Sequence, residues 1–324
     1  MWRTPLHQPD YRPQFSGHET FPLRYGWLKK AFDAVQDSKD VDDNRTVFSG
    51  PDAIARFGVG KNMVASMRHW AIATGIIEDA PRPKHIVTTT LGQLIFGKQG
   101  LDPFMEDPAT LWLIHWHLCG RATKTTWFWA FHYCPSISFE RETLITGIKN
   151  LAEVREWTKA AESTIRRDVA CFIRTYVAQS APGNASYEES LDSPLTELGL
   201  IRPSGRRDEF RFVRGPKPSL GPGVFCYAVI DFWNRYFSNA NTLSFEALNH
   251  EPGCPARVFM LEENDMVDML AALNETTNGD YSWSETAGLK QLIRKEPSGT
   301  DEALKYVQRD YAAVRHEELS NATG

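Results

Sequence analysis

The spacing of apolar side chains predicts a chain built mainly of helices. Apolar residues recur at helical intervals from Pro22 to Val35, from Lys61 to Thr74 and from Ser163 to Val177. A short helix from Pro51 to Phe57 and a turn at 58–60 are predicted before the second of these stretches. The β-branched run "HIVTTT" after it predicts a short strand. Helix, short helix, tight turn, longer helix and strand is the order of a winged helix-turn-helix.

A similar order is predicted in the remainder of the chain. "RETLITGIKNLAEV", "EWTKAAE" and the 163–177 stretch predict three helices, and the basic segment "RPSGRRDEFRFVRGPKP" alternates around Phe210 and Phe212 like a β-hairpin. The last third predicts further helices in a weaker version of the pattern. We therefore expect a mainly α fold with short β wings, made of tandem winged-helix-like units. The expected domains are an N-terminal one at 1–138, a central one with the basic hairpin at 139–218 and an acidic helical one at 219–324.

The distribution of charge limits how the chain can meet nucleic acid. The formal net charge is -5, divided as +2 over residues 1–138, +1 over 139–218 and -8 over 219–324. No global field therefore attracts DNA, and binding must come from local basic patches. The acidic last third suits the docking of partner proteins better than the reading of DNA.

Composition excludes several classes of protein. The start of the sequence, "MWRTPLHQPDYRPQF", has no apolar run of the secretory kind. The longest apolar stretch, "ATLWLIHWHLC", is about half the roughly twenty residues that a membrane helix needs. Five cysteines occur without a CxxC pair, which argues against a disulfide framework and a thiolate zinc site. We expect a cytoplasmic protein without a membrane span.

The stretch "FGVGKNMVASMRHW" combines features of a phosphate loop and of a DNA-contacting helix. A Walker loop needs GxxxxGK followed by Ser or Thr, after a buried strand. Asn62 stands where the hydroxyl should be, and the preceding "PDAIARF" predicts helix. We therefore expect no nucleotide cofactor. The helix is predicted to place Lys61, Asn62, Ser66 and Arg68 toward DNA and to bury Met63, Met67, Trp70 and Ala71.

Further basic residues are candidate DNA contacts. Arg166, Arg167 and Arg174 are predicted to point outward from the 163–177 helix. The hairpin supplies Arg206, Arg207 and Arg211, as a DNA-contacting wing would. Alternatively, the hairpin arginines protect a solvated sheet edge against aggregation.

The polar segment "SGHET" precedes the first predicted helix. Thr20 suits an N-cap with Pro22 in the first turn. His18 and Glu19 serve no such cap, and they are candidates for an acid/base or metal-binding pair.

A second acidic segment, "GLDPFMEDPATLWLIHWHLC", offers carboxylates and two histidines. Clustered carboxylates could hold a metal for DNA cleavage, with Asp102 the candidate. Asp107 before Pro108 is instead typical of a helix N-cap. His115 and His117 fall on different helical faces beside tryptophans, which favours core packing. The aromatic run at 125–133 could stack bases, but a core or an interface explains it more simply.

Seven segments in order carry a resemblance to a known family. They are "FSGHETFPLRYGWLKK", "GVGKNMVASMRHWA", "GLDPFMEDPATLWLIHWHL", "TTWFWAFHY", "STIRRDVACFIRTYV", "SPLTELGLI" and "RGPKPSL". Over roughly residues 15 to 275 the chain resembles the DUF4007 family. The resemblance implies a DNA-nicking component of a bacterial phosphorothioation system for phage defence. It also implies work beside a cysteine desulfurase, an ATP pyrophosphatase and an ATPase that mobilise sulfur, and a divalent metal, Mg²⁺ or Mn²⁺.

The motif positions permit an assignment of roles. Glu19 and Asp102 are assigned to the metal, His18 to general base or metal ligand, and Arg24 or Lys61 to the scissile phosphate of double-stranded DNA. No PD-(D/E)xK, HNH or GIY-YIG signature is present. The alternatives are a non-catalytic winged-helix adaptor that positions the modifying enzymes, and an operon regulator. The regulator would bind DNA as a symmetric homodimer.

Overall fold

The structure is a computed structural model that describes residues 4–158, 160–178, 193–206, 208–286 and 288–311. The chain divides into two compact units, each combining separate stretches of sequence. The larger unit contains residues 6–106 and 123–213; the smaller unit contains residues 107–122, the chain from 214 onward and the first five residues. The three domains predicted above remain a prediction, since both units interleave segments from them.

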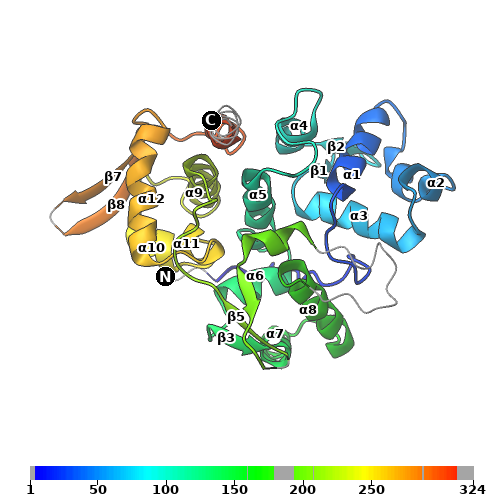
Figure 1. Cartoon of the computed structure of the whole chain (residues 1–324), viewed down its shortest axis with the longest axis horizontal. Helices are drawn as coiled ribbons and strands as arrows, with labels where there is room; N and C mark the ends of the chain where they lie inside the picture. The colour runs from blue at the N-terminus through cyan, green and yellow to red at the C-terminus, as the bar shows by residue number, and fades with distance from the viewer. Residues whose placement is uncertain (1–3, 159, 179–192, 207, 287, 312–324) are drawn as a thin grey trace, which may run out of the picture. The chain divides into compact units, whose positions relative to one another are not determined.

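The first part of the larger unit has the predicted order of helices, turn and strands (Figure 1). After η1 (Pro5–His7), its elements are α1 (Trp27–Asp37), η2 (Asn44–Phe48), α2 (Ala53–Phe57), α3 (Lys61–Ala73), β1 (Ile77–Asp79), β2 (Ile86–Thr88) and α4 (Thr90–Phe96). Gly58 ends α2 with a φ of 69°, a conformation that glycine adopts without a Cβ penalty. β1 and β2 pair antiparallel. The predicted short helix, glycine turn and longer helix are therefore confirmed.

The first helix begins later than its apolar spacing predicts. α1 starts at Trp27 after Gly26, whose φ is 75°, and no side chain caps it. The N-cap role predicted for Thr20 is therefore wrong. Leu23 is fully buried although it precedes the helix, so its apolar position reflects packing outside helical structure.

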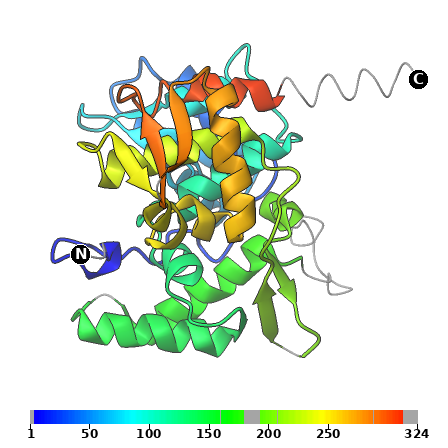
Figure 2. The same cartoon turned by 90° about the vertical axis from the view of Figure 1, so that its left-hand side faces the viewer.

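The second part of the larger unit contains the predicted basic hairpin. Its elements are α6 (Thr125–His132), β3 (Ser138–Glu140), α7 (Arg141–Val154), α8 (Glu162–Tyr176), η3 (Pro194–Leu198), β4 (Ile201–Pro203) and β5 (Glu209–Phe212). The antiparallel sheet has the order β3-β5-β4, and the hairpin stands out from the helices in Figure 2. The helix predicted for "EWTKAAE" is wrong, since the described residues before Glu162 form turns, with Glu156 at a φ of 54°.

The smaller unit repeats this strand order. Its elements are α5 (Pro108–Cys119), α9 (Pro222–Tyr236), β6 (Thr242–Ser244), α10 (Phe245–His250), α11 (Pro255–Val258), α12 (Glu263–Thr276), β7 (Tyr281–Thr286) and β8 (Leu289–Arg294). Its antiparallel sheet has the order β6-β8-β7. In each of these two sheets, the strand that precedes the helices in sequence (β3 or β6) pairs with the last strand (β5 or β8). Among the described helices, none is both long and apolar enough to cross a lipid bilayer.

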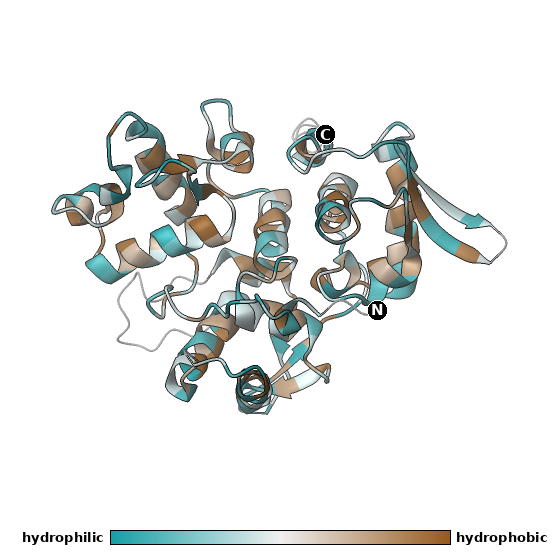
Figure 3. Cartoon of the chain, turned by 180° about the vertical axis from the view of Figure 1, so that it is seen from behind, coloured by the Kyte–Doolittle hydropathy of each residue, from teal (hydrophilic) through white to brown (hydrophobic). Residues whose placement is uncertain are grey.

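The buried face of α3 differs slightly from its predicted face. Met67, Trp70 and Ala71 are fully buried as predicted, but Val64 takes the inner position in place of the half-buried Met63. Ser66, predicted to face DNA, is fully buried. Figure 3 shows hydrophilic and hydrophobic residues alternating around this helix, as its amphipathic sequence requires.

The histidine-containing and aromatic helices belong to the core. Asp107 caps α5, accepting from the Ala109 N–H at 2.8 Å, so the predicted cap is confirmed. His115 and His117 are buried on α5, where Nε2 of His115 lies 2.8 Å from the Val258 carbonyl oxygen. The residues of α6 are all buried. The predicted packing roles of both segments are confirmed.

Burial of His115 gives the smaller unit a predictable dependence on pH. Desolvation lowers the pKa of this imidazole to about 4. Between pH 6.5 and 4 the unfolded chain therefore binds a proton that the folded chain does not, and stability falls as pH falls. At pH 5 this contribution has lost about 2 kcal/mol relative to pH 7.

The check is denaturant unfolding of wild type and His115→Leu at pH 7 and pH 5. Because burial also lowers the pKa of His117, only the difference between the proteins isolates His115. The free energy of unfolding of wild type minus that of His115→Leu should be about 2 kcal/mol smaller at pH 5 than at pH 7. A difference between the two proteins that is equal at both pH values would contradict this effect of His115.

Candidate functional site

The segment Ser16–Thr20 has an unusual backbone conformation. Ser16, Gly17, Glu19 and Thr20 have φ values of 64°, 87°, 46° and 66°. Positive φ is uncommon for residues that carry a Cβ, and three such residues in five positions store backbone strain. Such strain persists only where surrounding contacts enforce it, and it is typical of functional sites. We call this segment the GHET loop.

Two buried side chains hold the GHET loop from within. Oδ1 of Asp168, on α8, accepts hydrogen bonds from the Ser16 N–H at 2.9 Å and from His18 Nε2 at 2.8 Å. The Thr20 N–H donates to His18 Nδ1 at 3.0 Å. Because Nδ1 accepts, Nε2 carries the proton donated to Asp168, which fixes the tautomer. Both ring nitrogens of His18 are therefore engaged, and His18 is only 2% exposed.

α8 makes two further contacts with the chain that follows His18. Cys171 Sγ donates to the Phe21 carbonyl oxygen at 3.4 Å, and Arg174 donates to that of Thr20. Together with Asp168 these residues are spaced three apart, so they share one face of the helix. Arg174 is half-buried, which corrects its predicted outward position. Burial raises the pKa of Cys171, which disfavours a thiolate there.

Charged and aromatic groups pack beneath the GHET loop. His69, on α3, lies under Gly17, and a Cβ at Gly17 would be 2.5 Å from its Nδ1. Burial, with added repulsion from nearby cations, lowers the pKa of His69 well below its usual value. Burial lowers the pKa of Lys124 to about 8, against an opposing attraction from Asp168. The Trp127 ring lies 6.2 Å from the His18 ring, between centroids.

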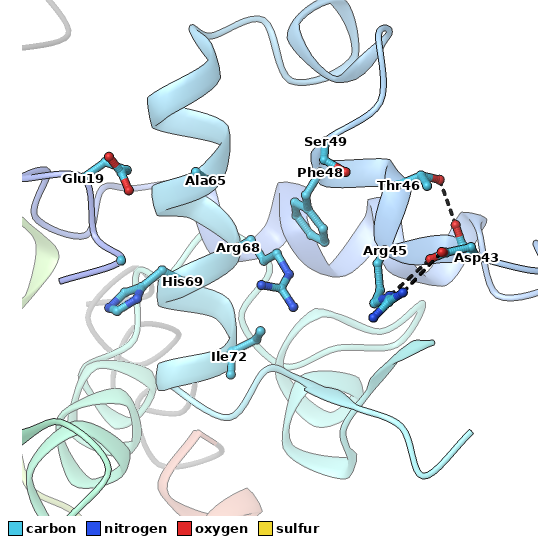
Figure 4. Close-up of a pocket in the computed structure, with 11 residues that line it drawn as sticks. Glu19, Asp43, Arg45, Thr46, Phe48, Ser49, Ala65, Arg68, His69 and Ile72 are labelled. Carbon is cyan, nitrogen blue, oxygen red and sulfur yellow. Dashed lines mark hydrogen bonds and ion pairs between the residues drawn. The ribbon is translucent and has the colours of Figure 1, made fainter. Parts of the chain in front are cut away.

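A pocket of about 620 Å³ lies beside the GHET loop, and Glu19 is among the residues that line it. The pocket is lined by Gly17, Glu19, Asp43, Arg45, Thr46, Phe48, Ser49, Ala65, Arg68, His69 and Ile72. Figure 4 shows Arg45 and Arg68 projecting between α3 and η2, with Glu19 beyond the other side of α3. Glu19 is exposed and forms no hydrogen bond or ion pair with any described residue.

The two pocket arginines form only exposed ion pairs. Arg45 pairs with Asp43 at 3.2 Å, and Arg68 pairs with Asp79 at 3.3 Å. All four side chains are a third or more exposed, and such surface pairs contribute little stability. Both guanidinium groups can therefore exchange their partners for an anionic ligand.

Asp102 lies away from this pocket. It is 5% exposed, and its Oδ1 accepts from the Glu106 N–H at 2.9 Å. Within the described ranges, no group of three or more His, Cys, Asp or Glu side chains is arranged to hold a metal ion. Asp102 lines no part of the Glu19 pocket, so the predicted pair does not fit one metal ion.

The predicted DNA contacts of α3 and its surroundings divide by exposure. Lys61 and Asn62 are exposed at the start of α3, and Arg68 faces the pocket. Arg24 is 5% exposed, with its guanidinium 5.5 Å from the Phe21 ring centroid and 5.4 Å from that of Trp27. Burial against these rings withdraws Arg24 from the surface.

The predicted contacts of the α8 region also differ in availability. Arg166 pairs with Glu142 and Glu162, each at 2.8 Å, whereas Arg167 bonds the Ser163 carbonyl oxygen at 3.3 Å. Arg206 is exposed and lies 4.0 Å from Glu209. Arg207 falls outside the described residues.

The hairpin brings Arg211, a predicted DNA contact, beside Arg202, which the sequence analysis missed. Arg211, on β5, lies directly opposite Arg202 on β4, and both are exposed. Neither forms an ion pair with a described residue. Like charges directly opposite one another destabilise a sheet, so this pair suits an anionic ligand.

Asp168 was also missed, although its position carried a signal. It lies among Ile165, Val169 and Phe172 on the buried face of α8, where an aspartate is rarely found without a partner. The partner, His18, lies 150 residues earlier, and sequence spacing alone could not reveal it.

Comparison with known proteins supports a single family. Residues 15–311 match the family described as "Protein of unknown function (DUF4007)", and no curated protein matches. A magnesium-bound crystal structure of SspB is similar, with 31% identity, a TM-score of 0.81, and coverage of 94% of this chain and 89% of that one. Another SspB crystal structure has 30% identity, a TM-score of 0.79 and the same coverage. The chain belongs to the DUF4007 family and has the fold of SspB over nearly its whole length.

Proposed function

We propose that this protein acts on DNA and nicks one strand of the duplex, as a component of a bacterial phosphorothioation system. The observation that carries the proposal is the exposed, unpaired Glu19 carboxylate, held on a strained loop beside a pocket with two arginines. A positioned carboxylate with cations for a phosphate is the equipment that phosphodiester hydrolysis requires. Similarity to SspB along 94% of the chain supports the same assignment.

We further propose that the protein is made of winged-helix-like units. The strand orders β3-β5-β4 and β6-β8-β7 place the strand before the helices next to the last strand, and each ends in a hairpin. The segment from α1 to β2 also has helices followed by a β-hairpin, but no strand precedes its helices. Exposed Lys61 and Asn62 at the start of α3 and the Arg202–Arg211 pair on the hairpin would contact the DNA backbone.

In the proposed reaction, water adds to phosphorus and one P–O ester bond breaks, so that a sugar oxygen leaves and takes up a proton from solvent. Arg45 and Arg68 would bind the phosphate and stabilise the charge that develops on its oxygens. Glu19 would orient the attacking water and accept its proton. His18 is replaced as general base, since both of its nitrogens are engaged within the protein.

A divalent ion is part of this proposal. Mg²⁺ is commonly held by one or two carboxylates together with substrate phosphates, and Glu19 lines the pocket with a carboxylate that no described residue pairs. When bound, the ion would supply neutralising charge at the phosphate. Asp102 has no part in it, because it is buried outside the pocket.

The proposed nick would open the backbone for sulfur insertion. The partners would be a cysteine desulfurase, an ATP pyrophosphatase and an ATPase, with docking through the acidic last third of the chain. A non-catalytic adaptor is the second candidate, favoured by the exposed basic residues of α3 and the hairpin. It would use the same DNA contacts without Glu19.

Relaxation of supercoiled plasmid by the purified protein with Mg²⁺ or Mn²⁺ separates the two candidates. We expect nicking that EDTA abolishes and that Glu19→Ala reduces at least 100-fold. Lys61→Ala should weaken binding more than it slows cleavage of bound plasmid. Wild type that retards the plasmid on a gel yet leaves it supercoiled would overturn the nickase proposal in favour of the adaptor.

A further inference from the structure

We infer that Asp168 is a positioning residue that sets the active conformation of the GHET loop from α8. The inference rests on the proposed function, because Glu19 is the group that the loop presents. Asp168 touches neither the pocket nor Glu19 itself, so its effect would pass through the backbone of residues 16–20.

The hydrogen bonds of Asp168 span the strained positions. Its Oδ1 accepts a hydrogen bond from the N–H of Ser16, the first residue with left-handed φ. The same oxygen accepts a hydrogen bond from His18 Nε2. His18 Nδ1 in turn accepts one from the N–H of Thr20, the last residue with left-handed φ. Glu19 therefore lies between two amides that the Asp168 carboxylate holds, one directly and the other through the His18 imidazole.

The burial of Asp168 is poorly explained by stability alone. It is 2% exposed, and its Oδ2 has no hydrogen-bond partner among the described residues. Leaving a buried polar atom unsatisfied costs about 1–3 kcal/mol. A hydrophobic residue at this position of α8 would avoid that cost but would leave the Ser16 amide and the His18 ring without an acceptor. The arrangement favours the geometry of the loop over maximal stability.

The test compares Asp168→Ala, which removes the acceptor, with Asp168→Asn, which retains an acceptor oxygen. Asp231→Asn is the matched control, because Asp231 is equally buried, lies on α9 of the smaller unit and binds Trp116 and Arg121. Two measurements are made on each full-length protein: amide hydrogen exchange at Ser16 and Thr20, and kcat and KM for plasmid nicking.

We expect Asp168→Ala to lose protection at both amides by at least tenfold and to lower kcat about 100-fold, with KM within about threefold of wild type. Asp168→Asn should recover much of both properties, and Asp231→Asn should change neither. Unchanged amide protection in Asp168→Ala would overturn the inference, as would lost protection with wild-type kcat. Should wild type fail to nick, the proposed function fails by itself, while the exchange measurement still decides whether Asp168 holds the loop.

Discussion

Gly17→Ala is expected to lower the nicking rate about 100-fold while leaving the protein folded. A Cβ at this position would lie 2.5 Å from Nδ1 of His69, well inside contact distance. His69 is packed against His18 and Trp70, so the GHET loop rather than the imidazole should move. A displacement of about 1 Å at a catalytic group can cost 10²-fold in rate. Plasmid relaxation measured at saturating DNA would report the loss in kcat.

Gly26→Ala provides the matched control for backbone strain. Gly26 has a φ of 75°, close to the 87° of Gly17, but a Cβ there meets nothing within 4 Å. Both variants should lose about 1 kcal/mol of stability from the left-handed conformation. Only Gly17→Ala should lose activity. Equal rates for the two variants would show that the loop tolerates displacement, and Glu19 would then lose its proposed catalytic role.

The parts of the fold that local periodicity determines could be predicted from the sequence. α2, the turn at Gly58 and α3 follow from apolar spacing and from the freedom of glycine at positive φ. The cap at Asp107 and the burial of His115 likewise follow from their immediate neighbours. In each case the energetic reason lies within a few residues of the feature.

The geometry of the candidate site could not be predicted in this way. His18 and Glu19 were identified as unusual, but their roles depend on Asp168, which is remote in sequence. The assignment of Thr20 as an N-cap failed because hydrogen bonds to the neighbouring His18 and to the remote Arg174 hold Thr20 outside the helix. Arg45 lines the pocket but lies in a polar segment without apolar periodicity. No sequence pattern therefore distinguished it from other surface arginines.

Trp127→Ala is expected to destabilise the larger unit by about 3–5 kcal/mol. Trp127 is 1% exposed, and its ring packs edge-on against Trp70 of α3 and Phe172 of α8, each at 5.6 Å between centroids. The cavity left by truncation would therefore open between elements from both parts of this unit. Hydrogen exchange followed by mass spectrometry would locate the loss.

The distribution of lost protection decides how the larger unit is organised. If it unfolds cooperatively, α3 and α8 should lose protection together, while α9 keeps its wild-type value. Trp233→Ala, a fully buried tryptophan of the smaller unit that bonds the Ala240 carbonyl oxygen, should give the reverse pattern. Loss confined to α6, α7 and α8, with α3 unchanged, would instead show that the segment from α1 to α4 is a separate cooperative domain. The hydrogen bonds between Asp168 and the GHET loop favour the first outcome, because they join the two parts through buried polar groups that neither part can satisfy alone.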